Sequence, residues 1–180
     1  MPELDLNGAR ILQVIGGGVA AFKALELIRR LRERGASVQV VLTPAAERFV
    51  TPLSAAALSA NPVRQELFSL TDEAEMGHIE LSRSADLIVV APATADFLAK
   101  MAHGQADDLA STTLLATDKR VLVAPAMNVR MWTHAATQRN VKQLRADGIA
   151  FVGPEDGAMA CGEFGPGRMS EPSAIADAVA

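Results

Sequence analysis

The chain has 180 residues, a formal net charge of −4 and one cysteine. This length fits one domain with a sizeable core, and the acidic balance argues against a nucleic-acid surface, which needs clustered Lys and Arg. One cysteine excludes an intrachain disulfide and metal sites of the Cys-x-x-Cys type. The sequence shows neither a membrane helix nor a signal peptide, so we expect a cytoplasmic protein.

A glycine-rich turn follows the first predicted strand, residues 10–15, and leads into a helix over about 20–34. Strand, glycine turn and helix can hold a phosphate through backbone N–H groups and the helix N-terminus. The turn lacks the Gly-x-Gly-x-x-Gly fingerprint, and no ribose-binding acid ends the next strand. The pattern therefore favours a mononucleotide over a dinucleotide. A tight turn without a ligand is the alternative.

Further apolar runs alternate with helical patterns along the chain. An α/β fold with a doubly wound parallel sheet follows from this alternation. Thr43, after the second strand, either caps a helix that begins at Thr43-Pro44 or offers its hydroxyl to a phosphate. The polar segment 66–75 is predicted to be a loop. Strands are predicted at 37–42, 85–91, 121–124 and 149–152, and helices near 52–59, 77–83, 97–102, 107–117, 131–146 and 171–180.

The stretch Pro125-Ala-Met-Asn-Val-Arg-Met-Trp132 directly follows the strand at 121–124. Ligands in open α/β sheets bind beyond the carboxyl ends of the strands. Asn128 in this stretch has two interpretations: it caps the following helix, a common role for Asn, or it binds a ligand.

The segment 153–169 contains five Gly, two Pro and the single cysteine, Cys161. This composition predicts no regular structure. Long loops are usually functional or disordered, so residues 155–170 are either a mobile flap with a reactive Cys161 or a flexible linker with an incidental one. The chain ends inside its last predicted helix, from which we expect a further domain beyond residue 180.

Five segments together resemble a known family. They are Gly17–Lys23, His78–Arg83, Pro92–Asp96, Pro125–Trp132 and Ala160–Met169. In this order they are similar to the homo-oligomeric flavin-containing cysteine decarboxylases, and within that family to the flavoprotein domain of the bacterial phosphopantothenoylcysteine decarboxylases. The resemblance covers nearly the whole chain and implies one Rossmann-like, flavodoxin-like domain over residues 1–180.

The resemblance also implies the cofactor and the site. FMN would be the cofactor, and no metal is implied. His78 would be the active-site base, Asn128 would hold the substrate, and Cys161 would be the proton donor. Arg83 would hold the substrate carboxylate, whereas Asp96 departs from the Asn that many members carry. The implied FMN contacts are Gly17, Gly18, Val19, Ala20, Thr43, Thr94, Ala95, Asp96, Phe97 and Ala126, and the other substrate contacts are Met131, Met159, Ala160, Arg168 and Met169.

The implied reaction converts 4′-phosphopantothenoylcysteine to 4′-phosphopantetheine in coenzyme A biosynthesis. The family forms trimers, which stack into dodecamers in bacterial members, with FMN between subunits, and a ligase domain would follow residue 180. Three alternatives remain: a peptidyl-cysteine decarboxylase, which needs no reductive step and no Cys161; a flavin prenyltransferase; and an inert regulatory subunit that binds FMN. The presence of His78 and Cys161 favours the complete decarboxylase.

Overall fold

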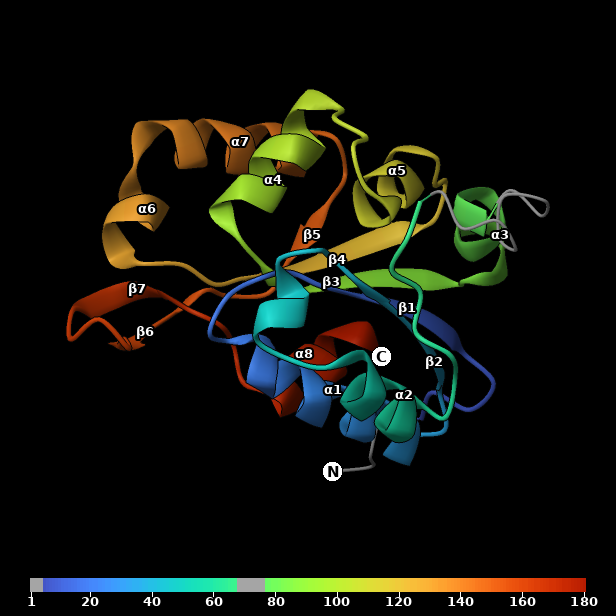
Figure 1. Ribbon diagram of the computed structural model, residues 1–180. Coiled ribbons are helices and arrows are strands. Elements are labelled where there is room, and N and C mark those ends of the chain that lie inside the picture. The colour runs from blue at the N-terminus through green and yellow to red at the C-terminus, as the bar shows by residue number, and fades with distance from the viewer. Residues whose placement is uncertain (1–4, 68–76) are drawn as a thin grey trace.

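The computed structural model describes residues 5–67 and 77–180, and its core is a five-stranded parallel sheet (Figure 1). The strand order is β2-β1-β3-β4-β5, and every neighbouring pair is parallel. This is the flavodoxin-like order, so the predicted doubly wound sheet is confirmed. The strands are β1 (Arg10–Ile15), β2 (Ser37–Leu42), β3 (Leu87–Ala93), β4 (Arg120–Pro125) and β5 (Ala150–Phe151).

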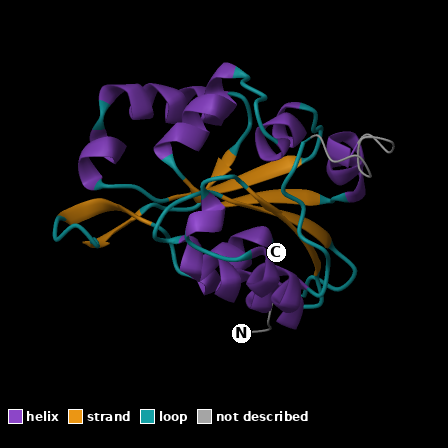
Figure 2. Cartoon of the chain, in the orientation of Figure 1, coloured by secondary structure: helices purple, strands orange, loops and turns teal. Residues whose placement is uncertain are grey.

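Helices cover both faces of this sheet (Figure 2). One layer contains α1 (Ala21–Glu33), α2 (Pro52–Ser59) and α8 (Pro172–Val179). The other layer contains α4 (Ala95–His103), α5 (Leu109–Leu115) and α7 (Ala135–Ala146), with α3 (Gly77–Ser84) packed against α5. None of the described helices is long and apolar enough to span a membrane.

Successive residues of β1 enter two separate cores. Ile11 and Ile15 pack in the core beneath α1 and α8, whereas Leu12 and Val14 pack in the core beneath α4 and α7. This alternation follows from the two-residue period of a strand. Because parallel strands are buried on both faces, they appear in the sequence as continuous apolar runs, which is why these strands could be predicted.

The predicted single helix over 131–146 is wrong. The chain forms a short helix, α6 (Val129–Thr133), followed by α7. His134 between them is extended, with φ −61° and ψ 137°, and its Nδ1 accepts a hydrogen bond from the Ala136 N–H at 3.0 Å. The helix predicted to begin at Thr43-Pro44 is a single 3₁₀ turn, η1 (Ala46–Arg48). Most of the loop predicted over 66–75 lies outside the described residues.

The prediction of no regular structure over 153–169 is also wrong. This segment forms an antiparallel hairpin of β6 (Glu155–Ala158) and β7 (Phe164–Arg168). Its glycines allow close packing against the end of β4: the Gly167 carbonyl accepts a hydrogen bond from the Met127 N–H at 2.9 Å, and a Cβ at Gly167 would collide with the Met127 carbonyl oxygen. Gly167 also has φ +144°, a conformation that side chains disfavour. Whether the hairpin is a mobile flap stays a prediction.

Candidate active site

A cavity of about 900 Å³ lies at the carboxyl ends of β1, β2, β3 and β4. Strand order reverses between β1 and β3, and ligands bind at such switch points. The volume of the cavity suits a small-molecule or cofactor site. The predicted site residues that line it are Gly17, Gly18, Val19, Ala20, Thr43, Thr94, Ala95, Asp96, Phe97, Ala126, Asn128, Met131, Met159, Ala160, Cys161, Arg168 and Met169.

The glycine turn after β1 forms one wall of this cavity. A Cβ at Gly17 would lie 2.6 Å from the carbonyl carbon of Ala45, so only glycine fits there. A Cβ at Gly18 would have Thr94 Cγ2 as its nearest neighbour at 3.8 Å and would enter the cavity. Helix α1 begins directly afterwards, and its N-cap residue, Ala20, makes no side-chain cap. The Ala21 and Lys23 N–H groups bond the Gly18 and Ala20 carbonyls, and the remaining N–H groups at this helix N-terminus suit a phosphate.

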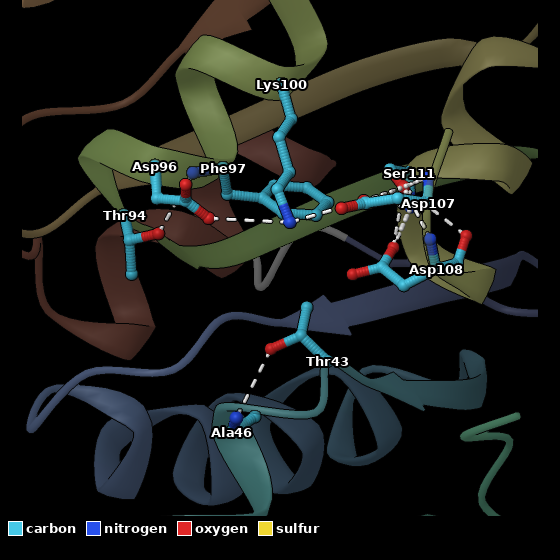
Figure 3. A network of polar contacts seen from close by, with 9 residues as sticks. All are labelled: Thr43, Ala46, Thr94, Asp96, Phe97, Lys100, Asp107, Asp108 and Ser111. Carbon is cyan, nitrogen blue, oxygen red and sulfur yellow. Dashed lines mark hydrogen bonds and ion pairs between the residues drawn. The ribbon is translucent and has the colours of Figure 1, made fainter. Parts of the chain in front are cut away.

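Two threonine hydroxyls lie at the cavity, one after β2 and one after β3 (Figure 3). Thr43 Oγ1 accepts a hydrogen bond from the Ala46 N–H at 3.3 Å. Thr94 Oγ1 accepts one from the Phe97 N–H at 3.2 Å and caps α4. A hydroxyl that accepts through its oxygen still has a hydrogen to donate. Thr43 therefore binds the first N–H of the 3₁₀ turn and keeps a hydrogen that it could donate to a ligand in the cavity.

Lys100 forms a charged part of the wall between two carboxylates (Figure 3). Its Nζ lies 3.6 Å from Asp96 Oδ2 and 3.2 Å from Asp107 Oδ1. Burial acts to lower the pKa of Lys100, but the Asp107 hydrogen bond and the neighbouring carboxylates raise it overall. The Lys100 hydrogen bond lowers the pKa of Asp107. Lys100 was not predicted as a site residue from the sequence, although its i,i+4 spacing from Asp96 indicated an ion pair. Among the described residues, no cluster of three or more His, Cys, Asp or Glu could hold a metal ion.

Asn128 both caps a helix and faces the hairpin. Its Oδ1 accepts a hydrogen bond from the Arg130 N–H at 2.8 Å and so caps α6. Its Nδ2 donates to Cys161 Sγ at 3.3 Å and to the carboxylate of Glu163. The interpretation of Asn128 as a helix cap is therefore confirmed, and ligand binding by its amide stays a prediction.

Glu163 is a residue of this site that the sequence analysis missed. Besides Asn128, its carboxylate accepts hydrogen bonds from Arg130 Nε at 3.2 Å and from Cys161 Sγ at 3.7 Å. The hydrogen bond from Asn128, and next that from Arg130, lowers the pKa of Glu163. The one available signal was its place two residues after Cys161 in a turn, where both side chains can reach one neighbour.

His78 and Arg83 lie on α3, apart from the other predicted residues. Figure 1 shows α3 at the opposite side of the molecule from α6 and the β6–β7 hairpin. In the described part of the chain, α3 adds no residue to the 900 Å³ cavity. It borders a smaller hollow of about 230 Å³ near Arg10 and Ser37, which begin β1 and β2. Within one chain, His78 and Arg83 do not meet Asn128 and Cys161.

Known proteins share this fold and much of this sequence. The chain is similar to the coenzyme A biosynthesis bifunctional protein CoaBC of Escherichia coli (strain K12), with 51% identity over 174 residues, 97% of this chain and 43% of that protein. It thus spans less than half the length of this curated relative. One solved structure is a mutant PPC decarboxylase complexed with pantothenoylaminoethenethiol, with 35% identity, a TM-score of 0.83 and coverage of 95% of this chain and 96% of that one.

A second solved structure is the FMN-dependent cysteine decarboxylase SpaF. It is 32% identical, with a TM-score of 0.79 and coverage of 97% of this chain and 99% of that one. The model of the family described as Flavoprotein matches residues 2–180 of this chain. With that match over nearly its whole length, the chain belongs to the Flavoprotein family.

Proposed function

We propose that this chain is an FMN-dependent decarboxylase that converts 4′-phosphopantothenoylcysteine to 4′-phosphopantetheine in coenzyme A biosynthesis. The observation that carries the proposal is the contact of Asn128 with Cys161 at the edge of a cavity of cofactor size. The similarity to a coenzyme A biosynthesis protein and to a PPC decarboxylase supports this substrate. A ligase domain after residue 180 stays a prediction.

The cavity fits FMN. The Gly17–Gly18 turn and the uncapped start of α1 would hold the phosphate. The hydroxyls of Thr43 and Thr94, with the Thr94–Phe97 backbone and Ala126, would surround the rest of the cofactor. Bound FMN would supply a hydride acceptor for the substrate thiol carbon and return the hydride at the end of the cycle.

The remaining steps belong to the side chains. A CH group that carries a carboxylate next to CH2–SH loses CO2 poorly, because the resulting carbanion is unstabilised. Oxidation of the thiol to a thioaldehyde provides an electron sink, and loss of CO2 then gives an enethiolate. Asn128 would stabilise this anion with one of its two Nδ2 hydrogens, which the bound intermediate would receive in place of a partner within the chain. Cys161 would then act as a positioned general acid and donate a proton to the carbon that lost CO2.

His78 and Arg83 would come from a second copy of the chain. His78 would accept the substrate thiol proton and Arg83 would hold the carboxylate, yet both lie on α3, which adds no residue to the lining of the cavity. Large apolar side chains at the cavity are exposed: Val19 by 61%, Phe22 by 62% and Met131 by 49%. Exposed apolar surface of this kind supports burial against a partner. We infer a homotrimer, alone or within a dodecamer, with FMN at the subunit interface.

A product assay tests this function. Purified protein loaded with FMN is incubated anaerobically with 4′-phosphopantothenoylcysteine, and the products are measured by mass spectrometry. We expect CO2 and 4′-phosphopantetheine in equal amounts, and neither from an Asn128→Asp variant that still binds FMN. Wild-type protein that binds FMN but leaves the substrate intact would contradict the proposal. Release of the enethiol alone would indicate an oxidative cysteine decarboxylase instead.

A further inference from the structure

Glu163 joins the two groups on which the proposed reaction depends. We propose that Glu163 is a positioning residue that holds the Cys161 thiol and the Asn128 amide together, so that the decarboxylated intermediate is protonated before it escapes. This role rests on the proposed function and adds to it a residue that directs the outcome of each turnover.

The Glu163 carboxylate receives three donors from different parts of the fold. Oε2 accepts from Asn128 Nδ2, at the end of β4, and from Cys161 Sγ, in the β6–β7 turn, at 3.7 Å. Oε1 accepts from Arg130 Nε, on α6, at 3.2 Å. The same oxygen therefore contacts both the amide and the thiol. Removal of this carboxylate takes away their shared partner.

The backbone fixes where this carboxylate lies. The Glu163 carbonyl accepts a hydrogen bond from the Met159 N–H at 2.9 Å, which closes the turn around Cys161. On the adjoining strand, the Gly167 carbonyl binds the Met127 N–H and attaches the hairpin to the end of β4. The Glu163 side chain thus points from an anchored hairpin toward Asn128.

The ion pair with Arg130 does not by itself explain why a carboxylate lies at position 163. The Arg130 side chain is 86% exposed, and exposed ion pairs contribute little to stability. The Glu163 side chain is 36% exposed, and its other two contacts are to Asn128 and Cys161. These contacts suit a role in the reaction better than a role in stability.

The protonation states define the direction of each hydrogen bond. The Asn128 and Arg130 hydrogen bonds lower the pKa of Glu163, so the carboxylate is ionised at neutral pH and can only accept. The thiol of Cys161 must then be the donor in its contact with Glu163. At the same time its sulfur accepts from Asn128 at 3.3 Å. The sulfur therefore has a hydrogen-bond partner on each of two sides.

Loss of Glu163 should impair the reductive half of the reaction and leave the oxidative half largely intact. Asn128 stays oriented by the Arg130 N–H, which binds its Oδ1 at 2.8 Å, so oxidation and loss of CO2 should continue. Cys161 lies in an exposed turn, and in Glu163→Gln it would keep only a neutral amide oxygen, which is a weaker acceptor than a carboxylate. Protonation of the enethiolate would then slow, and more of it would leave as the enethiol before the hydride is returned.

The experiment is an anaerobic single turnover of the FMN-loaded full chain as wild type, Glu163→Gln, Glu163→Asp and Glu155→Gln. Flavin absorbance gives the rate of the oxidative half, and mass spectrometry gives the ratio of enethiol to thiol. For Glu163→Gln we expect flavin reduction within about threefold of wild type and a ratio at least about tenfold higher, as for a displaced general acid. Glu163→Asp, which keeps two charged acceptors, should restore most of the thiol.

Glu155 is the matched control, because it is an exposed acid at the other end of the same hairpin; its variant should match wild type. A wild-type ratio in Glu163→Gln would overturn the role. An equal decrease in flavin reduction and in thiol formation, with FMN still bound, would also overturn the role, since it would indicate a general effect on substrate binding. Wild-type protein that reduces no flavin would instead overturn the proposed function, and this role with it.

Discussion

The side-chain amide of Asn128 donates a hydrogen bond to the sulfur of Cys161 across 3.3 Å, although 33 residues separate the two along the chain. Asn128 follows β4 of the main sheet, and Cys161 lies in the turn of the β6–β7 hairpin. The Met127–Gly167 hydrogen bond brings these segments together. An amide that can bind an anion thus lies beside a thiol that can donate a proton.

Replacement of Cys161 by serine should stop the cycle after CO2 has left. A hydroxyl gives up its proton far less readily than a thiol, so the enethiolate would not be protonated. We expect normal flavin reduction and a yield of 4′-phosphopantetheine lowered by at least about a hundredfold, the scale of general acid catalysis. Mass spectrometry of a single turnover measures both products. Full yield of the thiol from this variant would rule out Cys161 as the donor.

His78 and Asn128 should complement each other between chains, because Asn128 lines the cavity whereas α3, which carries His78, adds no residue to it. His78→Asn and Asn128→Asp should each be inactive alone. Co-expressed with different tags and purified as mixed oligomers, they should recover about a quarter of wild-type activity, the fraction of sites with both intact residues after random assembly. Mixed oligomers without activity would show that both residues act within one chain.

Alanine at Gly17 and at Gly18 should have different effects. A Cβ at Gly17 would press against Ala45, which we expect to destabilise the fold by about 1–3 kcal/mol, as overpacking does, and to disturb FMN binding. A Cβ at Gly18 would be 3.8 Å from its nearest neighbour and would occupy the cavity. The Gly18 variant should therefore melt near the wild-type temperature but bind FMN more weakly. Calorimetry and FMN titration separate the two effects, and tight FMN binding by the Gly18 variant would contradict a phosphate site at this turn.

The pair of Asp86 and Arg10 should make stability depend on pH in acid. Asp86 Oδ1 lies 2.7 Å from an Arg10 guanidinium nitrogen, and the Arg10 hydrogen bonds lower the Asp86 pKa from 3.8 to about 2. A carboxylate with a lowered folded-state pKa stabilises the fold above pH 3.8, and this contribution is lost as the pH falls through about 2. Asp86→Asn should therefore be less stable than wild type at neutral pH, by a small margin because the pair is half exposed.

Urea unfolding of both proteins between pH 7 and pH 2 measures this contribution. The difference between their unfolding midpoints should shrink toward zero at the acid end. A difference that stays constant down to pH 2 would show that the Asp86 charge is not its source.

The main sheet could be predicted because its strands have only one interpretation. Residues 10–15 and 37–42 are apolar runs bounded by turns, and both are strands with those bounds. The break at His134 could not be predicted, since the residues on both sides favour a helix and only its extended backbone separates α6 from α7. The hairpin was missed because glycine is usually a sign of irregular structure, whereas Gly167 allows the backbone to reach Met127.

The candidate site was predictable to a similar degree. The residues that line the cavity could be predicted from the ends of the strands and from the family resemblance, because parallel strands bring their carboxyl ends to one edge of the sheet. The separation of His78 from Asn128 within one chain could not be predicted, since the sequence alone does not show that α3 lies on the opposite side of the molecule from α6. Glu163 was missed because its role depends on the turn that places it beside Cys161 and Asn128.

The most direct test of the proposed function is the absorbance of the flavin during one anaerobic turnover. FMN-loaded protein is mixed with one equivalent of 4′-phosphopantothenoylcysteine, and the oxidised-flavin band is followed in time. We expect the band to bleach and then to recover fully without oxygen, with 4′-phosphopantetheine as product. A band that bleaches and stays bleached would contradict the complete cycle, and a band that never changes would contradict flavin-dependent decarboxylation of this substrate.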